Sequence, residues 1–217
     1  MGCRAPAGRM GRDPKARDPA APIDSTALVI LPATAERWPD VVTLLGGSDE
    51  RGCWCQAWRG RVLGDPSGPG AGNRERLEAQ VRSGPAAPGV VAYLDGEPVG
   101  WCGLGPRAAM SRLVRSRTIP RVDELAAWSI GCFVVRPGYR RRGVARALLG
   151  GAIAYARAQG APCLEAYPID PAGARVSTSF GFVGFTSMFD AAGFRRVLLT
   201  DARSAGLPRW LVRLDLR

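Results

Sequence analysis

The sequence predicts an α/β or α+β domain built around a mixed sheet, and three features carry that prediction. Apolar runs of strand length alternate with segments of helical periodicity throughout residues 26–217. The pair Asp95-Gly96 separates two of the apolar runs, which is the strongest short-range signal for a β-hairpin. A further apolar run at 128–135 is joined by a basic loop to an amphipathic stretch at 144–158.

The chain before the hairpin is expected to begin with a tail. Residues 1–25 are rich in Ala, Pro, Gly and Arg, so burial of apolar surface cannot repay the entropy of ordering them. We therefore expect a flexible tail at 1–25 and one domain at 26–217. The elements expected next are a strand at 27–31, a helix at 34–45 that ends at Gly46-Gly47, a Cys-Trp-Cys run at 53–55, a Pro- and Gly-rich loop at 65–72, and a short helix capped by Asn73.

From the hairpin onward, strands outnumber helices. The hairpin strands are expected at 90–94 and 98–102, and an arginine-rich loop follows at 107–121. The remaining elements are expected as a strand at 128–135, a helix at 144–158 that ends before Gly160, a strand at 164–167, a short helix at 187–192, and strands at 197–200 and 210–214.

Composition excludes several kinds of catalytic machinery. The chain has no histidine, which removes Ser-His-Asp and Cys-His nucleophiles, histidine bases and histidine-containing metal sites. Its formal charge is +11, and all but one of its 30 basic residues are arginine, which suits bidentate contacts with phosphate and carboxylate. The tail carries five basic and three acidic residues, so nine of these charges belong to the domain. This excess of positive charge is explained either by anionic partners or by a plain compositional bias.

The cysteines and the lack of a long apolar run bear on the cellular compartment. Three of the six cysteines lie in apolar, strand-like runs and no secretory segment precedes them, so we expect reduced thiols in a cytoplasmic protein. Cys53 and Cys55 offer two sulfur ligands without a second pair at suitable spacing, so we expect no metal. No run approaches the roughly 18 apolar residues of a membrane span, so we expect no membrane partner.

The segment most informative about function runs from Val135 to Ala145. It joins a buried strand to an amphipathic helix and contains the run Arg140-Arg141-Arg142-Gly143-Val144-Ala145. A loop in this position presents unpaired backbone N–H groups at a helix N-terminus, where the dipole favours anions. Gly143 lets an oxyanion approach the backbone, and the arginines add charge-assisted contacts. The segment predicts a phosphate-binding loop, and an ordinary basic turn is the plainer interpretation.

This segment resembles the coenzyme motif of the GNAT superfamily of acetyl-CoA-dependent N-acetyltransferases, a strand ending in V-x-P followed by R/Q-x-x-G-x-G/A. The resemblance extends from about residue 26 to residue 216. It implies the GNAT fold, with a mixed, mostly antiparallel central sheet flanked by helices, and acetyl-CoA as the cosubstrate. The coenzyme-binding residues that it implies are Phe133, Val135, Arg140, Arg141, Arg142, Gly143, Val144, Ala145 and Asp170.

Two positions depart from the pattern of the superfamily. Arg141 stands where many members have glycine. An arginine is tolerated at this position if its φ is negative, so we expect a negative φ at Arg141. Phe189 stands four residues before Gly193, where many members have the tyrosine that protonates the departing thiolate. A thiolate can leave without full protonation, because thiol pKa values lie far below those of alcohols. We therefore expect Phe189 to be a packing residue.

The candidates for the catalytic acid and base lie in and near one predicted strand. The stretch Leu164-Glu165-Ala166-Tyr167 resembles the segment in which some members carry the glutamate that serves as base, so Glu165 is the first candidate. Strand alternation puts Glu165 and Tyr167 on one face, as an acid/base pair reaching a cleft. A surface glutamate beside an aromatic rim residue is the alternative interpretation. Asp123 and Glu124 are the alternative base.

The resemblance implies transfer of an acetyl group to a primary amine of a small molecule or peptide by direct attack in a ternary complex. The acceptor is unknown, and an acidic one would suit the arginines at 107–121. Trp54 and Trp58 either line the acceptor pocket with them or fill the core. An insertion at 171–186, longer than the superfamily commonly needs, forms either a mobile lid or a passive loop.

Other classes of function stay open beside the enzyme. A noncatalytic acyl-CoA-binding regulatory module is suggested by Phe189 at the usual acid position. A nucleic-acid binder is suggested by the charge, but aromatic residues are scarce and the arginines gather at the proposed coenzyme loop. The oligomeric state also stays open, a homodimer included.

Overall fold

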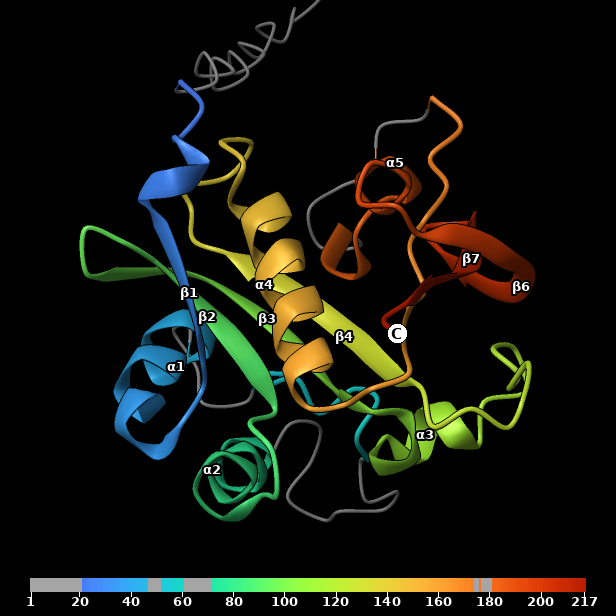
Figure 1. Ribbon diagram of the computed structural model, residues 1–217, viewed down its shortest axis with the longest axis horizontal. Coiled ribbons are helices and arrows are strands. Elements are labelled where there is room, and N and C mark those ends of the chain that lie inside the picture. The colour runs from blue at the N-terminus through green and yellow to red at the C-terminus, as the bar shows by residue number, and fades with distance from the viewer. Residues whose placement is uncertain (1–20, 47–51, 61–71, 174–175, 177–180) are drawn as a thin grey trace, which may run out of the picture.

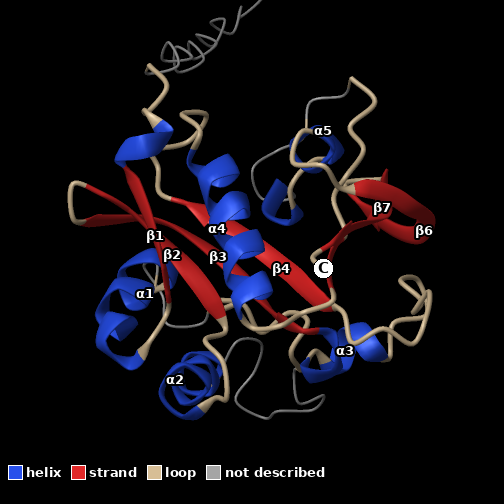
Figure 2. Cartoon of the chain, in the orientation of Figure 1, coloured by secondary structure: helices blue, strands red, loops and turns tan. Residues whose placement is uncertain are grey.

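The computed structural model describes residues 21–46, 52–60, 72–173, 176 and 181–217. Its strands are β1 Leu28–Pro32, β2 Gly89–Leu94, β3 Glu97–Pro106, β4 Trp128–Val135, β5 Cys163–Ala166, β6 Arg195–Ser204 and β7 Leu207–Asp215. They form a seven-stranded sheet in the order β1-β2-β3-β4-β5-β7-β6, shown in Figures 1 and 2. Every neighbouring pair is antiparallel except β4 and β5, which confirms the expected mixed, mostly antiparallel sheet.

Helices cover both faces of this sheet. They are α1 Trp38–Leu45, α2 Asn73–Ser83, α3 Ser111–Val114, α4 Val144–Ala158 and α5 Thr186–Asp190. Helix α4 crosses β1 to β4 on one face, in front of the sheet in Figure 1, and α1 packs on β3 and β4 from the other face. Adjacent residues of β3 show this division, because Gly100 lies against Leu148 of α4 and Trp101 packs in the cluster that contains α1. No helix in the described ranges is long and apolar enough to span a membrane.

The elements around the predicted phosphate loop lie where the sequence places them. Strand β4 and helix α4 match the expected ranges 128–135 and 144–158. The hairpin turn is also confirmed, with φ of 51° at Asp95 and 81° at Gly96, the left-handed pair that a tight hairpin requires. Boundaries shift elsewhere, and the helix expected at 34–45 begins with a 3-10 turn at Ala35–Arg37 before α1.

The capping role expected for Asn73 is wrong. Gly72, with φ of 68°, holds the cap position, and Asn73 is the first residue of α2. The Asn73 side chain is buried, and its amide nitrogen donates to the carbonyls of Gly52 and Cys53, both at 3.3 Å. Asn73 therefore fastens α2 to the segment 52–60, and that tertiary contact takes the place of a local cap.

The expectation of six reduced thiols is wrong for one pair, because Cys55 and Cys132 form a disulfide. The two residues are 77 positions apart, so no local pattern reveals the pairing. Gly103 on β3 makes room for it, since a Cβ there would lie 2.7 Å from the sulfur of Cys55. The indole Nε1 of Trp101 donates to the same sulfur at 2.9 Å. The sheet face that carries Cys132 is thereby linked to the segment 52–60.

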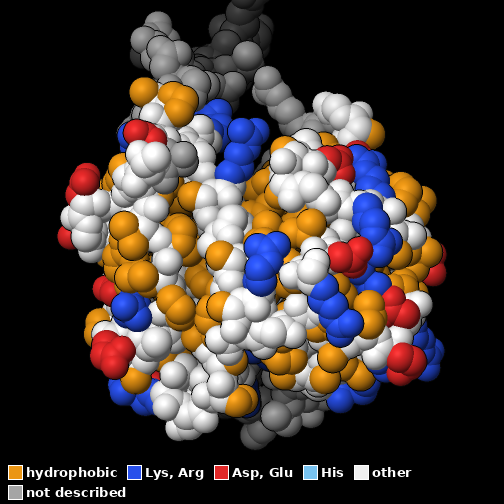
Figure 3. Space-filling model, in the orientation of Figure 1, with side chains coloured by type: hydrophobic (Ala, Val, Ile, Leu, Met, Phe, Trp, Pro, Cys, Tyr) orange, Lys and Arg blue, Asp and Glu red, His pale blue; other side chains and the backbone are white. Residues whose placement is uncertain are grey.

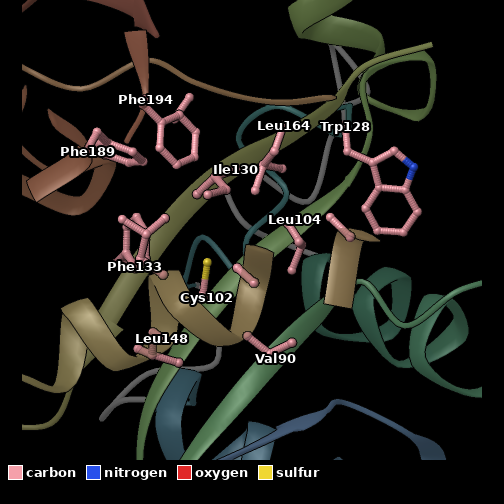
Figure 4. Close-up of a cluster of buried hydrophobic side chains, with 14 of the residues drawn as sticks. Val90, Cys102, Leu104, Trp128, Ile130, Phe133, Leu148, Leu164, Phe189 and Phe194 are labelled. Atoms are coloured by element: carbon pink, nitrogen blue, oxygen red, sulfur yellow. The ribbon is translucent and has the colours of Figure 1, made fainter. Parts of the chain in front are cut away.

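The main hydrophobic core lies between the sheet and α4 and continues to α5 (Figure 4). Phe133, Phe189 and Phe194 meet there edge to face, with ring centroids 6.2 Å apart for the first pair and 5.1 Å for the second. Phe189 has no solvent exposure, which confirms the expected packing role. No hydroxyl group stands at this position to protonate a leaving group.

Candidate functional site

The loop between β4 and α4, residues 136–143, borders a cavity of about 500 Å³ at the N-terminus of α4. The cavity is lined by Pro22, Val135, Tyr139, Arg140, Arg141, Arg142, Gly143, Val144, Ala145, Arg146 and Met188. Val135 and all six expected residues of the run 140–145 are therefore brought together. In Figure 1 this loop, yellow, lies at the top of α4 beside the blue N-terminal segment.

Backbone donors face outward along this loop without partners. The N–H groups of residues 141–145 make no hydrogen bond of good geometry to an acceptor in the described ranges, and no side chain caps α4. Gly143 is the cap residue, with φ of 96°. Unpaired N–H groups and the positive end of the helix dipole together favour an anion here. Blue side chains gather over the same end of α4 in Figure 3.

The backbone of Arg141 corrects the sequence prediction, because its φ is 60° and not negative. Left-handed residues alternate with others along the loop, with φ of 89° at Gly138 and 96° at Gly143 on either side. Such alternation turns successive N–H groups toward a shared concavity that binds anions. A non-glycine residue in this conformation costs roughly 1–2 kcal/mol, so the loop carries local strain at Arg141.

Residues 21–24, which we assigned to the tail, lie against this loop. The Ile23 N–H donates to the carbonyl of Arg142 at 3.0 Å, and Arg142 Nε donates to the carbonyl of Ala21 at 2.9 Å. Pro22 lines the cavity, and Ile23 packs on the main core. The Arg142 side chain is thus partly held by the chain itself. Of the rest of the expected tail, Ser25 begins a 3-10 turn at Ser25–Ala27, and residues 1–20 lie outside the described residues.

Two of the expected coenzyme residues lie apart from the cavity. The Phe133 side chain points into the core against Phe189. The Asp170 carboxylate accepts from Arg196 Nη1 at 2.9 Å, and Asp170 does not line the cavity. Four residues that line the cavity were not predicted from the sequence: Pro22, Tyr139, Arg146 and Met188.

Two of these missed residues, Tyr139 and Met188, differ in whether a sequence signal could have identified them. Tyr139 lies inside the motif and meets two arginines, with Arg136 and Arg142 guanidinium carbons 5.9 and 6.0 Å from its ring centroid. That interleaving of aromatic and basic residues was a usable signal. Met188 comes from α5, and no local pattern connects it to the loop.

Strands β4 and β5 pair over a short length. Their parallel ladder contains Trp128 with Leu164 and Ser129 with Glu165, and then stops. Near the same place the register between β3 and β4 shifts, leaving Gly131 as an extra residue in a bulge. The edge of β4 between the bulge and the cavity therefore has no ladder partner in the described part of β5. The two catalytic candidates, Glu165 and Tyr167, lie where the β4/β5 ladder stops, and neither lines the cavity at the N-terminus of α4.

Glu165 is 2% exposed and is held by ionic and hydrogen-bonding partners. Its Oε1 accepts from Arg213 Nε at 3.2 Å and Nη2 at 2.6 Å. Its Oε2 accepts from the Tyr167 hydroxyl at 3.0 Å and lies 3.6 Å from Arg107 Nε. The shared face predicted for Glu165 and Tyr167 is confirmed, but both side chains are buried, so an amine has no direct contact with the carboxylate.

The Tyr167 hydroxyl has a second partner, Ser129 Oγ at 3.0 Å, with either oxygen as the donor. Burial, followed by the charge of Glu165, raises the pKa of Tyr167 well above its usual value. The phenol therefore stays protonated at neutral pH. Ser129, Tyr167 and Glu165 form a continuous hydrogen-bonded chain at the point where β4 and β5 separate.

The alternative bases lie at the rim of this cluster. Asp123 is hydrogen bonded by Arg213 Nη1, which lowers the pKa of its carboxyl group below the usual value. The Glu124 side chain is 92% exposed and pairs with Arg121 at 2.9 Å. Asp123 thus shares the arginine that holds Glu165, and Glu124 stands apart from it.

The two tryptophans considered for the acceptor pocket differ. Trp54 is 2% exposed and stacks on Trp38 with ring centroids 6.0 Å apart, so it belongs to the core beneath α1. Trp58 is half-buried, lies 6.3 Å from the Tyr167 ring and lines a second cavity. Most of the insertion expected at 171–186 is described, but positions 174–175 and 177–180 lie outside the described residues.

The family model of the Acetyltransferase (GNAT) family matches residues 54–182, which include β4, the loop and the Glu165 cluster up to Tyr167. The chain belongs to the GNAT family. Family membership confirms the resemblance drawn from the loop motif and makes acetyl-CoA the expected cosubstrate. No curated protein matches the sequence.

Solved structures confirm the GNAT fold. A mutant agmatine N-acetyltransferase in its apo form superposes with a TM-score of 0.55 at 14% identity, over 88% of this chain and all of that one. A putative acetyltransferase from Salmonella typhimurium with its cofactor acetyl-CoA gives 0.50 at 16% identity, over 88% and 95%. An N-acetyltransferase from Staphylococcus aureus Mu50 gives 0.50 at 14% identity, over 88% and 99%. At these sequence identities, the similarity to the three solved structures supports the fold alone.

Proposed function

We propose that this GNAT protein is an N-acetyltransferase that transfers an acetyl group from acetyl-CoA to a primary amine of a small molecule or peptide, by direct attack in a ternary complex. The observation that carries the proposal is the row of five unpaired backbone N–H groups at residues 141–145, at the N-terminus of α4. Membership of the acetyltransferase family supports it.

The residues of the loop fit a pyrophosphate group. The N–H donors suit phosphate oxygens, and Gly143 presents no Cβ to them. Arg140 Nε is bound to the carbonyl of Val135 at 3.0 Å, which orients the rest of its guanidinium. Arg141 has no hydrogen bond to a described residue, so its guanidinium is available for a charge-assisted contact.

When bound, acetyl-CoA supplies an acetyl thioester that is activated toward amines. The chain would orient it through Val135, which lines the cavity and ends the stretch of β4 that has no ladder partner in β5. Backbone groups on that edge would hydrogen bond the pantetheine arm and direct the thioester toward the separation of β4 and β5.

Proton removal from the attacking ammonium is assigned to Glu165, acting through Tyr167. Tyr167 is as buried as Glu165, so the proposal requires the amine to reach the phenol on binding. The phenol then accepts a proton from the amine and passes its own proton to Glu165 Oε2, 3.0 Å away. The raised pKa of Tyr167 suits a relay, because the phenol carries its proton before and after the step. The departing thiolate needs no protein acid, which agrees with the fully buried Phe189.

A noncatalytic acyl-CoA-binding module is the second candidate. Two observations favour it: Phe189 replaces a hydroxyl-bearing side chain, and Glu165 already has ionic partners. Release of coenzyme A from acetyl-CoA in the presence of a panel of primary amines separates the two. Turnover with any amine supports the enzyme, and tight acetyl-CoA binding without turnover supports the module.

The coenzyme site is tested by replacing Gly143 with Asp and measuring acetyl-CoA binding by calorimetry. We expect affinity to fall by roughly 100-fold or more, because a carboxylate then faces the phosphates and the cap is strained. Gly160→Asp is the matched control, since Gly160 follows the other end of α4 with φ of 72° and open space around its Cα. Equal affinities in the two variants would overturn the coenzyme assignment.

The relay is tested by Tyr167→Phe. We expect kcat to fall by about 10²-fold with acetyl-CoA affinity retained, because the phenol oxygen is lost and the loop is untouched. Wild-type kcat in this variant would direct the search for the base to Asp123 or Glu124.

A further inference from the structure

A second cavity, of about 580 Å³, lies on the sheet face opposite α4. It is lined by Trp58, Arg112, Arg115, Ser116, Thr118, Asp201, Ala202, Arg203 and Arg209. Four of these side chains are arginines and one is an aspartate, so the lining carries a clear excess of positive charge. Arg112 and Arg115 make no side-chain hydrogen bond or ion pair with any described residue. The charge of this cavity is therefore not neutralised from within.

The inner wall of the cavity contains a buried cation with a spare donor. Arg209 is 6% exposed, its Nε donates to the carbonyl of Tyr167 at 2.8 Å, and its guanidinium lies 5.3 Å from the Trp58 ring centroid. Its Nη2 has no hydrogen-bond partner within the part of the chain that the structure describes. The same holds for Trp58 Nε1. Buried donors without partners cost free energy, so their presence beside a cavity indicates a ligand that accepts hydrogen bonds.

The cavity adjoins the proposed proton relay. Arg209 bonds to the backbone of Tyr167, and the Trp58 and Tyr167 rings lie 6.3 Å apart. Strand alternation on β7 places Arg209 and Arg213 on one face, so the arginine that borders the cavity and the arginine that holds Glu165 lie on the same side of the sheet. A molecule that fills this cavity would reach the relay from the side opposite α4.

We propose that this cavity binds an anionic oxygen group, a carboxylate or a phosphate, of the acceptor amine. The inference rests on the proposed acetyltransferase function and narrows its substrate to amines that carry such a group. Arg112 and Arg115 attract and bind the anion, Arg209 supplies a directional donor, and the Trp58 ring supplies an apolar wall. The amine end of the acceptor then points toward Tyr167. Neutral amines and polyamines lack the group that these arginines recognise.

Anion binding is tested first, without turnover. The protein is saturated with coenzyme A, so that the α4 cavity is filled, and is then titrated with inorganic phosphate by calorimetry. We expect one further phosphate to bind, and the double variant Arg112→Gln/Arg115→Gln to weaken it by about tenfold or more. The control Arg117→Gln/Arg217→Gln changes net charge equally, at exposed arginines that do not line the cavity. No phosphate binding, or equal weakening in both double variants, overturns the site.

The role in acceptor choice is tested by kinetics on matched amines. Amino acids whose amine and carboxylate stand at opposite ends of a short carbon chain are compared with their primary amides. We expect kcat/KM to favour the acids by about tenfold or more, and the Arg112→Gln/Arg115→Gln variant to lose that preference while the control keeps it. Equal rates for acids and amides overturn the proposal and leave the acetyltransferase intact. Failure of the protein to bind coenzyme A at all would instead overturn the proposed function.

Discussion

The loop proposed to bind the coenzyme and the Glu165 cluster are built in opposite ways. The loop takes its unpaired groups from consecutive residues, 141–145, and these groups are backbone N–H donors. The cluster gathers charged and hydroxyl side chains from separate parts of the chain: Arg107, Asp123, Ser129, Glu165, Tyr167 and Arg213. The loop is solvated and locally strained, and Glu165 at the centre of the cluster is almost fully buried.

Because of this difference, substitutions in the loop should mainly affect ligand binding, and substitutions in the cluster should mainly affect the stability of the fold. A change in the loop alters groups that the fold itself leaves unpaired, so it should affect the ligand more than the fold. A change in the cluster leaves a charge buried without its counter-charge, which is among the costliest changes available to a folded chain. Variants in the two regions should therefore move different measurements.

The largest effect on stability is expected from Glu165→Gln. Arg213 and Arg107 would lose the buried carboxylate between them, which should lower the free energy of unfolding by about 3–5 kcal/mol. Urea denaturation of the variant measures this directly. Affinity for acetyl-CoA, measured under conditions where the variant is folded, should change little.

Gly143→Asp is the loop variant to compare with Glu165→Gln. Its midpoint of urea denaturation should be close to that of the control Gly160→Asp, whereas its affinity for the coenzyme should be lost. If Glu165→Gln unfolded at the wild-type urea concentration, the cluster would not be a stabilising unit, and the division between the two regions would fail.

A smaller, pH-dependent effect is expected from Asp123. Its carboxyl pKa is lowered mainly by the hydrogen bond from Arg213, so the folded state favours the charged form. This contribution is present above the unfolded pKa of about 3.9 and is lost as pH falls through the folded value. Asp123→Asn should therefore lower Tm at pH 7, and its Tm curve should converge with that of the wild type below about pH 4. Parallel curves throughout would contradict the pairing.

The parts of the site that the sequence predicted are those encoded locally. The hairpin at Asp95-Gly96, strand β4, helix α4 and the loop between them at 136–143 each depend on neighbouring residues, and the structure has all of them. The shared face of Glu165 and Tyr167 follows from strand alternation alone.

The parts that the sequence could not predict depend on distant partners. The Cys55–Cys132 disulfide, the Arg213 ion pair of Glu165 and the place of Met188 all join residues far apart in the chain. A carboxylate that would ordinarily be solvated is buried because arginines from other segments neutralise it, and no local pattern encodes those arginines. The positive φ of Arg141 was missed for a different reason, since the structure holds a non-glycine residue in a conformation that its own preference disfavours.

The strain at Arg141 gives the next prediction. Arg141→Gly should raise the free energy of unfolding relative to Arg141→Ala by about 1 kcal/mol, because glycine adopts φ of 60° freely and alanine does not. Both variants lose the guanidinium, so both should bind acetyl-CoA more weakly than the wild type to a similar extent. A Gly variant no more stable than the Ala variant would mean that the backbone at this position is unstrained.

The smallest effect is expected from the segment that lies against the loop. Removing residues 1–24 deletes the Ile23 N–H that bonds to the Arg142 carbonyl and the Ala21 carbonyl that accepts from Arg142 Nε. Each hydrogen bond contributes about 0.5–1.5 kcal/mol, so KM for acetyl-CoA should rise by roughly twofold to tenfold as Arg142 and its backbone lose their orientation. Removing residues 1–20 alone retains both bonds and is the control, for which KM should stay unchanged. The contacts of this segment with Arg142 predict that it holds the loop in the binding conformation. Because Pro22 lines the cavity, a lower KM after removal of residues 1–24 would contradict this prediction and show that the segment obstructs the coenzyme.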